Sequence, residues 1–117
     1  MSDPVPASGW REFLLWCLRR RRTYRVRGPS MAPTLPDGAV VLVNPAAYAH
    51  QGPQAGDFVI AHHPFRTDVT LLKRVAEVQT DGRCVLLSDN PAAGTDSRSF
   101  GPIRPTQILG KVTSRLR

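Results

Sequence analysis

The sequence is poor in cysteine and has no long apolar run. Its two cysteines, Cys17 and Cys84, lie far apart in segments of unlike composition, so they form neither a disulfide framework nor a CxxC metal or redox motif. The most apolar stretch, residues 10–18, contains two charged side chains and is about half the ~20 residues that a membrane-spanning helix needs. Arginines 19–22 follow this stretch, whereas a cleavable export signal places its positive charges first. We therefore expect a cytoplasmic protein without a spanning helix.

The overall composition is that of one globular domain. A chain of 117 residues, 41% apolar and 21% charged, can bury a core but is too short for two independent ones. Eleven prolines and nine glycines argue against long helices, because proline removes a backbone donor and glycine raises the entropic cost of helix formation.

The positive charge is concentrated near the N-terminus. Residues 1–27 contain seven arginines and two acidic residues, so they carry +5 of the formal net charge of +7. Residues 10–21 are predicted to form one amphipathic helix, with Trp10, Phe13 and Trp16 among its apolar side chains. Residues 10–27 are thus a candidate for peripheral contact with an anionic membrane surface, at the inner face of the membrane. A nucleic-acid arm is disfavoured, because no DNA- or RNA-reading pattern accompanies the arginines, and a solvated arginine run is the remaining alternative.

From residue 23 onward, short β-branched runs alternate with turn residues, which predicts an all-β domain. The predicted strands cover residues 23–27, 39–43, 57–61, 69–78, 83–87 and 108–113. We expect residues 1–22 to form a tail with the basic helix, loose over residues 1–9, and residues 23–117 to form the domain. Residues 88–105 read as a long polar loop, of a kind that is uncommon unless it has a function.

Two residues in this pattern are candidates for a catalytic role. Lys73 shares one face of its predicted strand with apolar neighbours, and burial of a lysine lowers its pKa and makes it a usable general base. An edge-strand lysine whose ammonium reaches water is the structural alternative. Ser30 lies between prolines 29 and 33, in a segment that can be neither helix interior nor central strand, so its hydroxyl is presented on a constrained loop. A serine in such a loop is more often simply a turn residue.

Four segments together carry a resemblance to a known family. GPSMAPTLPDGAVVLV, GDFVIAHHP, LLKRV and SDNPAAGTDSRSFGPI occur in this order and resemble the type I signal peptidases, which are serine/lysine proteases. The resemblance implies coiled antiparallel sheets, with Ser30 as nucleophile and Lys73 as its general base. It also implies that the Ser30 backbone N–H stabilises the oxyanion, that Met31 lines the cleft, and that Asp96 and Arg98 support the site.

The chain departs from the family pattern at three positions. Gly28 and Gly94 stand where many members have a serine, one donating to the oxyanion and the other orienting the lysine. Ser88 stands where a glycine usually precedes the Asp-Asn pair. Thr95 is the substitute that we consider for the hydroxyl missing at position 94.

The short form of the chain and its DNPAAGTDSRSFG loop are most similar to the small branch of nickel-type superoxide dismutase maturation proteases. This resemblance implies that the substrate is the proform of that enzyme, which loses an N-terminal propeptide. Two alternatives stay open: a minimal peptidase that trims membrane-bound precursors, and a non-catalytic basic binding module of the same fold.

No cofactor and no metal are expected. The adjacent histidines His62 and His63 would point to opposite faces of a strand, and no further ligands stand at a metal-site spacing. A pair of Ser30 with either histidine is a minor alternative, because the GxSxG nucleophile elbow is absent.

Overall fold

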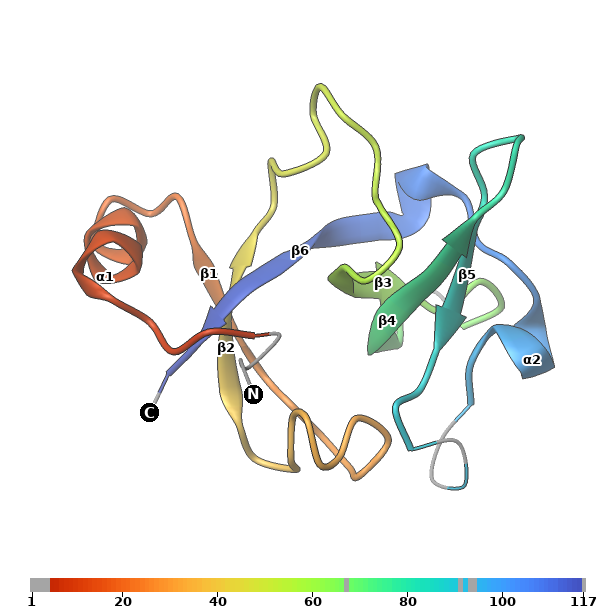
Figure 1. Ribbon diagram of the computed structural model, residues 1–117, viewed down its shortest axis with the longest axis horizontal. Helices are drawn as coiled ribbons and strands as arrows, with labels where there is room; N and C mark the ends of the chain where they lie inside the picture. Colours follow the sequence, from red (N-terminus) through yellow and green to blue (C-terminus); the bar gives the residue numbers. More distant parts are fainter. Residues whose placement is uncertain (1–4, 67, 91, 93–94, 117) are drawn as a thin grey trace.

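A single antiparallel sheet organises the computed structural model, which describes residues 5–66, 68–90, 92 and 95–116 (Figure 1). Its strands are β1 (Arg22–Arg25), β2 (Val40–Asn44), β3 (Phe58–His62), β4 (Thr70–Val78), β5 (Cys84–Leu87) and β6 (Ile108–Arg115). The helices are α1 (Trp10–Cys17), α2 (Ser97–Phe100) and the short 3₁₀ turn η2 (Pro105–Gln107). The predicted fold class, antiparallel sheet with a short N-terminal helix, is confirmed.

The last strand joins the two halves of the sheet. The strand order is β1-β2-β6-β3-β4-β5, so β6 lies between β2 and β3 and pairs antiparallel with both. The pairing shifts register at residues 42/43, 60/61 and 75/77. Such bulges increase local twist and bend a strand, which lets the sheet coil over its own core.

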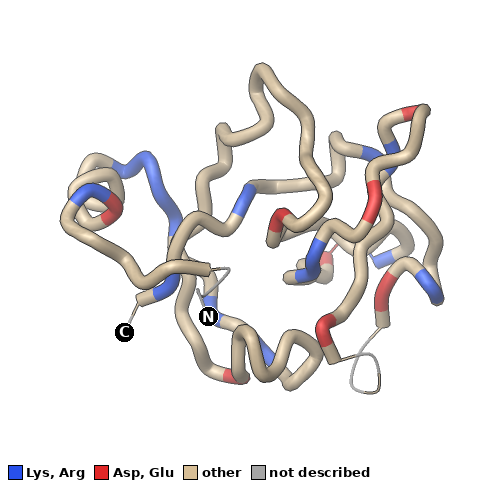
Figure 2. The backbone as a smooth tube through the Cα atoms, in the orientation of Figure 1, with Lys and Arg blue, Asp and Glu red and all other residues tan. Residues whose placement is uncertain are grey.

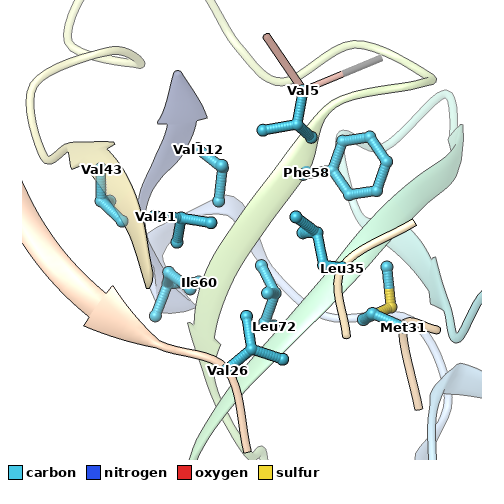
Figure 3. Packing of buried hydrophobic residues seen from close by; sticks show 10 residues of the cluster. All are labelled: Val5, Val26, Met31, Leu35, Val41, Val43, Phe58, Ile60, Leu72 and Val112. Carbon is cyan, nitrogen blue, oxygen red and sulfur yellow. The ribbon is translucent and has the colours of Figure 1, made fainter. Parts of the chain in front are cut away.

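Two apolar clusters cover opposite faces of the central strands. In β3, Phe58 and Ile60 belong to the first cluster, whereas Val59 and Ala61 belong to the second. This division follows from the alternation of side chains along a strand, and it makes β3 buried on both faces. The first cluster contains Val5, Val26, Met31, Leu35, Val41, Val43, Phe58, Ile60, Leu72 and Val112 (Figure 3). The second contains Val59, Ala61, Val75, Cys84, Leu86 and Ile103.

The predicted helix over residues 10–21 is four residues too long. Helix α1 ends at Cys17, and Arg19 adopts φ 62°, in the left-handed region. The Arg19 and Arg20 N–H groups donate to the carbonyls of Trp16 and Leu15, which satisfies acceptors that a helix end leaves open. This backbone motif ends the helix, so the arginine run lies outside it.

The expectation of a loose segment at residues 1–9 is wrong for its second half. Val5 is buried in the first cluster, and Ala7 forms a parallel bridge with Arg115 of β6. The Ser8 hydroxyl also lies 2.7 Å from the Ser114 hydroxyl. An apolar side chain and backbone pairing therefore hold this segment against β6; residues 1–4 lie outside the described part of the chain.

The segment predicted as a long loop, residues 88–105, contains regular structure. Helix α2 begins after Asp96, and Ile103 pairs with Cys84 through two backbone hydrogen bonds. Ile103 is fully buried in the second cluster, so the end of this segment is anchored beside β5.

Candidate active site

Ser30 and Lys73, 43 positions apart in sequence, meet in the folded chain. Ser30 lies on the connection between β1 and β2, Lys73 lies in β4, and the Ser30 Oγ is 3.1 Å from the Lys73 Nζ. The connection is held firmly, because Val26, Met31 and Leu35 are all buried in the first cluster. The Leu35 N–H also donates to the Met31 carbonyl.

Lys73 is buried among apolar side chains. The predicted alternation of this strand is confirmed, since Leu72 belongs to the first cluster and Val75 to the second. Only 3% of Lys73 is exposed, and this burial lowers the pKa of its ammonium from the ordinary 10.5. The carboxylate of Asp96 acts in the opposite direction and offsets part of this effect. Lys73 therefore loses its proton at a lower pH than an exposed lysine.

A second hydroxyl, that of Ser88, contacts the same amine. The Ser88 Oγ lies 3.0 Å from the Lys73 Nζ, and the Ser88 backbone N–H donates to Asp96 Oδ2 over 2.9 Å. Ser88 follows β5, whose last residue, Leu87, pairs with Arg74 of β4. Strand pairing thus brings Ser88 beside Lys73, and sequence reasoning treated this residue only as a departure from the pattern.

The next two residues connect the same loop to the segment that contains Ser30. Asp89 forms an ion pair with Arg74, with Oδ2 3.0 Å from Nη2. The Asn90 backbone N–H donates to the Ser30 carbonyl over 2.7 Å, and its side-chain amide donates to the Pro29 carbonyl over 3.2 Å. Sequence reasoning treated Asp89 and Asn90 only as part of a loop that supports the site and did not name them as site residues; the available signal was their position inside the quoted SDNP motif.

Asp96 is the buried acid at the base of the site. It caps the N-terminus of α2 by accepting the Arg98 N–H, and its carboxylate also accepts from the Arg98 guanidinium. These hydrogen bonds, first of all those from the guanidinium, hold the pKa of Asp96 well below its usual range. Asp96 and Arg98 therefore form an ion pair at the N-terminus of α2.

Gly28 and Gly94 stand where many family members have a serine, and the structure describes only the first of these two positions. Gly28 adopts φ +82°, a conformation that L side chains rarely adopt, so a serine here would be strained. Gly94 lies outside the described residues. Thr95 is exposed, and within the described residues the hydroxyls in contact with Lys73 are those of Ser30 and Ser88.

A cleft of about 600 Å³ opens beside Ser30 and Lys73. It is lined by residues 23–27 and 68–73 together with Ser30 and the fully buried Met31. Strand β4 pairs with β5 only from Arg74 onward, so residues 70–73 leave one backbone edge unpaired by β5. A cleft with an open strand edge is suited to an extended peptide.

His63 makes contacts within its own loop, whereas the minor alternative pairs a histidine with Ser30. The His63 Nδ1 accepts the backbone N–H groups of Phe65 and Arg66, which is a loop contact. In the described part of the chain, the side-chain partner of the Ser30 hydroxyl is Lys73, and no group of three histidine, cysteine or acidic residues could hold a metal ion.

Among the described residues no helix has the length and apolarity needed to cross a bilayer.

Comparisons with known proteins show the family of the chain. The family model "Signal peptidase, peptidase S26" matches residues 13–81, more than half of the chain. The chain is 31% identical to the mitochondrial ATP-independent inner membrane protease subunit 1b of Arabidopsis thaliana, over 76% of this chain and 66% of the relative. It is 31% identical to the mitochondrial inner membrane protease subunit 1 of Homo sapiens (73% and 63%) and 27% identical to signal peptidase IB of Staphylococcus aureus (79% and 75%). It spans slightly less than two thirds of the length of these mitochondrial relatives. The chain belongs to the signal peptidase family, peptidase S26.

Proposed function

We propose that this protein is a serine endopeptidase that uses Ser30 and Lys73 as a catalytic dyad to remove an N-terminal segment from a protein precursor. The observation that carries the proposal is the 3.1 Å contact between a loop hydroxyl and a lysine amine that is only 3% exposed. Burial favours the neutral amine, which is the form able to accept a proton from the hydroxyl.

Acylation follows from this contact. The neutral Lys73 Nζ takes the proton of the Ser30 hydroxyl while the Oγ forms a bond to the scissile carbonyl carbon. The resulting oxyanion needs a donor, and within the described residues no protein acceptor occupies the Ser30 backbone N–H. When the C–N bond breaks, the Lys73 ammonium returns its proton to the leaving amine.

Deacylation repeats the same proton transfers with water. The amine of Lys73 takes a proton from a water molecule as the water oxygen attacks the acyl carbon. The bond from this carbon to the Ser30 Oγ then breaks, and the Oγ recovers a proton from the Lys73 ammonium. Enzyme and base return to their starting protonation states, so this scheme for hydrolysis uses no other group as acid or base.

The substrate that we propose is the proform of nickel-type superoxide dismutase. The similarity of the DNPAAGTDSRSFG loop to the maturation proteases of that enzyme supports the choice. Removal of a propeptide exposes a new terminal amine, and a free amine together with thiolates is a suitable ligand set for nickel. The cleft between residues 23–27 and 68–73 would bind the precursor as an extended strand.

The experiment is intact-mass spectrometry of a purified nickel superoxide dismutase precursor incubated with this protein. We expect the loss of one defined N-terminal peptide with the wild type and no loss with Ser30→Ala or Lys73→Ala, because the two residues act as a unit. Ser114→Ala is the matched control, since it also removes a serine hydroxyl, from a buried serine that lies in β6 against Ser8.

Two results would contradict the proposal. Cleavage by correctly folded Ser30→Ala or Lys73→Ala protein would remove the dyad. If the mass of this precursor stays unchanged while the same enzyme cleaves another precursor, the proposed substrate is refuted but the proposed dyad is not.

A second candidate is a peptidase that processes precursors at a membrane surface, and helix α1 favours it. No residue of α1 is buried, and Trp10 and Phe13 are 79% and 57% exposed. In water an isolated helix of eight residues is marginal, so apolar side chains in this arrangement are best stabilised by a partner. The exposed large apolar side chains of α1 and its cap are Trp10, Phe13, Leu14, Trp16 and Leu18.

The charges around α1 select the kind of partner. Arginines gather on the segment that leads from α1 into β1, at the end of the molecule opposite α2 (Figure 2; Figure 1). An anionic bilayer satisfies both features, since tryptophans enter the interface while arginines bind headgroups. Nucleic acid would use only the charge, and a second protein copy only the apolar surface. We therefore propose that α1 and the arginines to residue 27 hold the protein at an anionic membrane, peripherally at its inner face.

Vesicle co-sedimentation tests this anchor. We expect binding to phosphatidylglycerol vesicles, weaker in high salt, and little binding to phosphatidylcholine vesicles. Replacing Trp10, Phe13 and Trp16 by serine should abolish binding, whereas Phe65→Ser, which removes another exposed aromatic (78%), should not. Equal binding by the triple variant would refute the anchor. Faster cleavage of a vesicle-bound precursor than of the soluble one would favour this candidate, and salt-sensitive binding without any turnover would favour a non-catalytic module.

A further inference from the structure

A lysine that acts as a base has to be aimed as well as neutral. The amine of Lys73 has one lone pair and two N–H groups at the end of a flexible four-carbon chain, and its contact with Ser30 leaves rotation about the terminal bond free. A second fixed partner on the amine would remove this freedom. The Ser88 hydroxyl, 3.0 Å from the Nζ, is such a partner.

The Ser88 hydroxyl is itself held in place. Ser88 is 7% exposed, and its backbone N–H donates to Asp96 Oδ2 over 2.9 Å. Asp96 is 2% exposed and is fixed in turn by the backbone and guanidinium of Arg98. A continuous series of hydrogen bonds therefore runs from α2 through Asp96 and Ser88 to the Lys73 amine.

We propose that Ser88 is the residue that positions Lys73 for proton transfer, by accepting an amine N–H so that the lone pair points at the Ser30 hydroxyl. This inference rests on the proposed Ser30/Lys73 dyad. It gives Ser88 no bond to substrate, so Ser88 is a positioning residue. The series of hydrogen bonds through Asp96 then gives this buried carboxylate a role: it holds Ser88 in place without contacting Ser30.

The variant Ser88→Ala tests this role cleanly, because the bond to Asp96 involves the backbone and survives the substitution. We expect kcat to fall roughly 10- to 100-fold with KM little changed, since misplacement of a reacting group by about 1 Å can cost a factor of roughly 100. The deficit should persist at alkaline pH, where Lys73 is neutral in both proteins, because orientation and not ionisation is lost. Ser88→Gly, which also lacks the hydroxyl, should show the same deficit.

Ser114→Ala is again the matched control, since it also removes a buried serine hydroxyl and its hydrogen bond but lies far from the dyad in sequence. It should retain wild-type kcat and pH profile. A folded Ser88→Ala protein with wild-type kcat, or with a deficit that disappears at alkaline pH, would overturn the role of Ser88. Wild-type activity that survives Ser30→Ala would instead overturn the dyad, so the two failures are distinguishable.

Discussion

At the scale of single residues, the burial of Lys73 lowers the stability of the fold, and the proposed chemistry depends on that burial. A buried ammonium loses hydration that one nearby carboxylate only partly replaces, so the folded state favours the neutral amine. The two hydroxyls around the Nζ satisfy it without supplying a full negative charge. This environment stabilises the fold poorly, but it leaves the amine neutral at a lower pH than in an exposed lysine.

The pH profile of cleavage should follow the ionisation of Lys73. Because the neutral amine is the active form, kcat/KM should rise with pH through an apparent pKa that lies below 10.5. The profile is measured with the precursor whose cleavage is established, and Ser114→Ala should share it. A rate without any ionisation below 10.5 would contradict a buried lysine base.

Replacing Lys73 by methionine should stabilise the protein while abolishing cleavage. The folded pKa is lowered, so between that value and 10.5 the unfolded chain binds more protons and the stability of the wild type rises with pH. The cost of burying the charge is thus fully present at lower pH, and Lys73→Met should gain about 1–2 kcal/mol there. Urea unfolding at two pH values measures this gain, which should shrink as pH rises. A variant that is less stable than the wild type at neutral pH would contradict this account.

At the scale of elements, the site depends on where strands end. Strand β5 stops at Leu87, and the following residues 88–90 bind in turn Lys73, Arg74 and the carbonyls of the Ser30 loop. The same ending leaves residues 70–73 of β4 as an open edge along the cleft. One strand terminus therefore both supports the proposed dyad and leaves an open edge for an extended substrate.

The insertion of β6 between β2 and β3 requires a small residue at one crossing. A Cβ on Gly110 would stand 2.6 Å from Val43 Cγ1 and 2.8 Å from the Asn44 carbonyl oxygen. Gly110→Ala should therefore lower the unfolding free energy by about 2 kcal/mol, because the backbone oxygen cannot move aside cheaply. Gly52→Ala, where a Cβ meets nothing within 4 Å, is the control. Equal stability of the two variants by urea denaturation would show that β2 and β6 are not packed this closely.

At the scale of the whole molecule, one sheet joins two clusters and leaves α1 outside them. Strands β3 and β4 contribute to both clusters, so neither cluster can come apart without disturbing the other. Helix α1 has no buried residue and stands to the side of the sheet (Figure 1). The proposed catalytic site and the proposed membrane contact are therefore separable by mutation.

The two clusters should unfold together. Leu72→Ala in the first cluster and Leu86→Ala in the second should each cost about 3 kcal/mol, since both side chains are buried and leave cavities. Each variant should show a single urea transition at which far-UV circular dichroism and peptidase activity are lost together. If circular dichroism and activity were lost at different urea concentrations, the two clusters would be independent folding units.

The sequence by itself determined the elements and the chemical character of two residues. Alternation of apolar residues predicted the strands and the buried face of Lys73, since side-chain direction in a strand depends only on local order. Prolines around position 30 predicted a constrained loop for the same local reason. Local patterns misjudged the ends of elements: α1 stops at a left-handed Arg19, and Val5 is buried by contacts with residues far along the chain.

Only the tertiary structure decided which groups meet. The 3.1 Å contact of Ser30 and Lys73 depends on a loop anchored in the first cluster, and the Ser88 contact depends on where β5 ends beside β4. These contacts are set by strand register and by the packing of distant segments, for which no single stretch of sequence contains the information. For that reason the lysine and the serine were visible as candidates, whereas the contact of the Ser88 hydroxyl with the lysine became visible only in the folded chain.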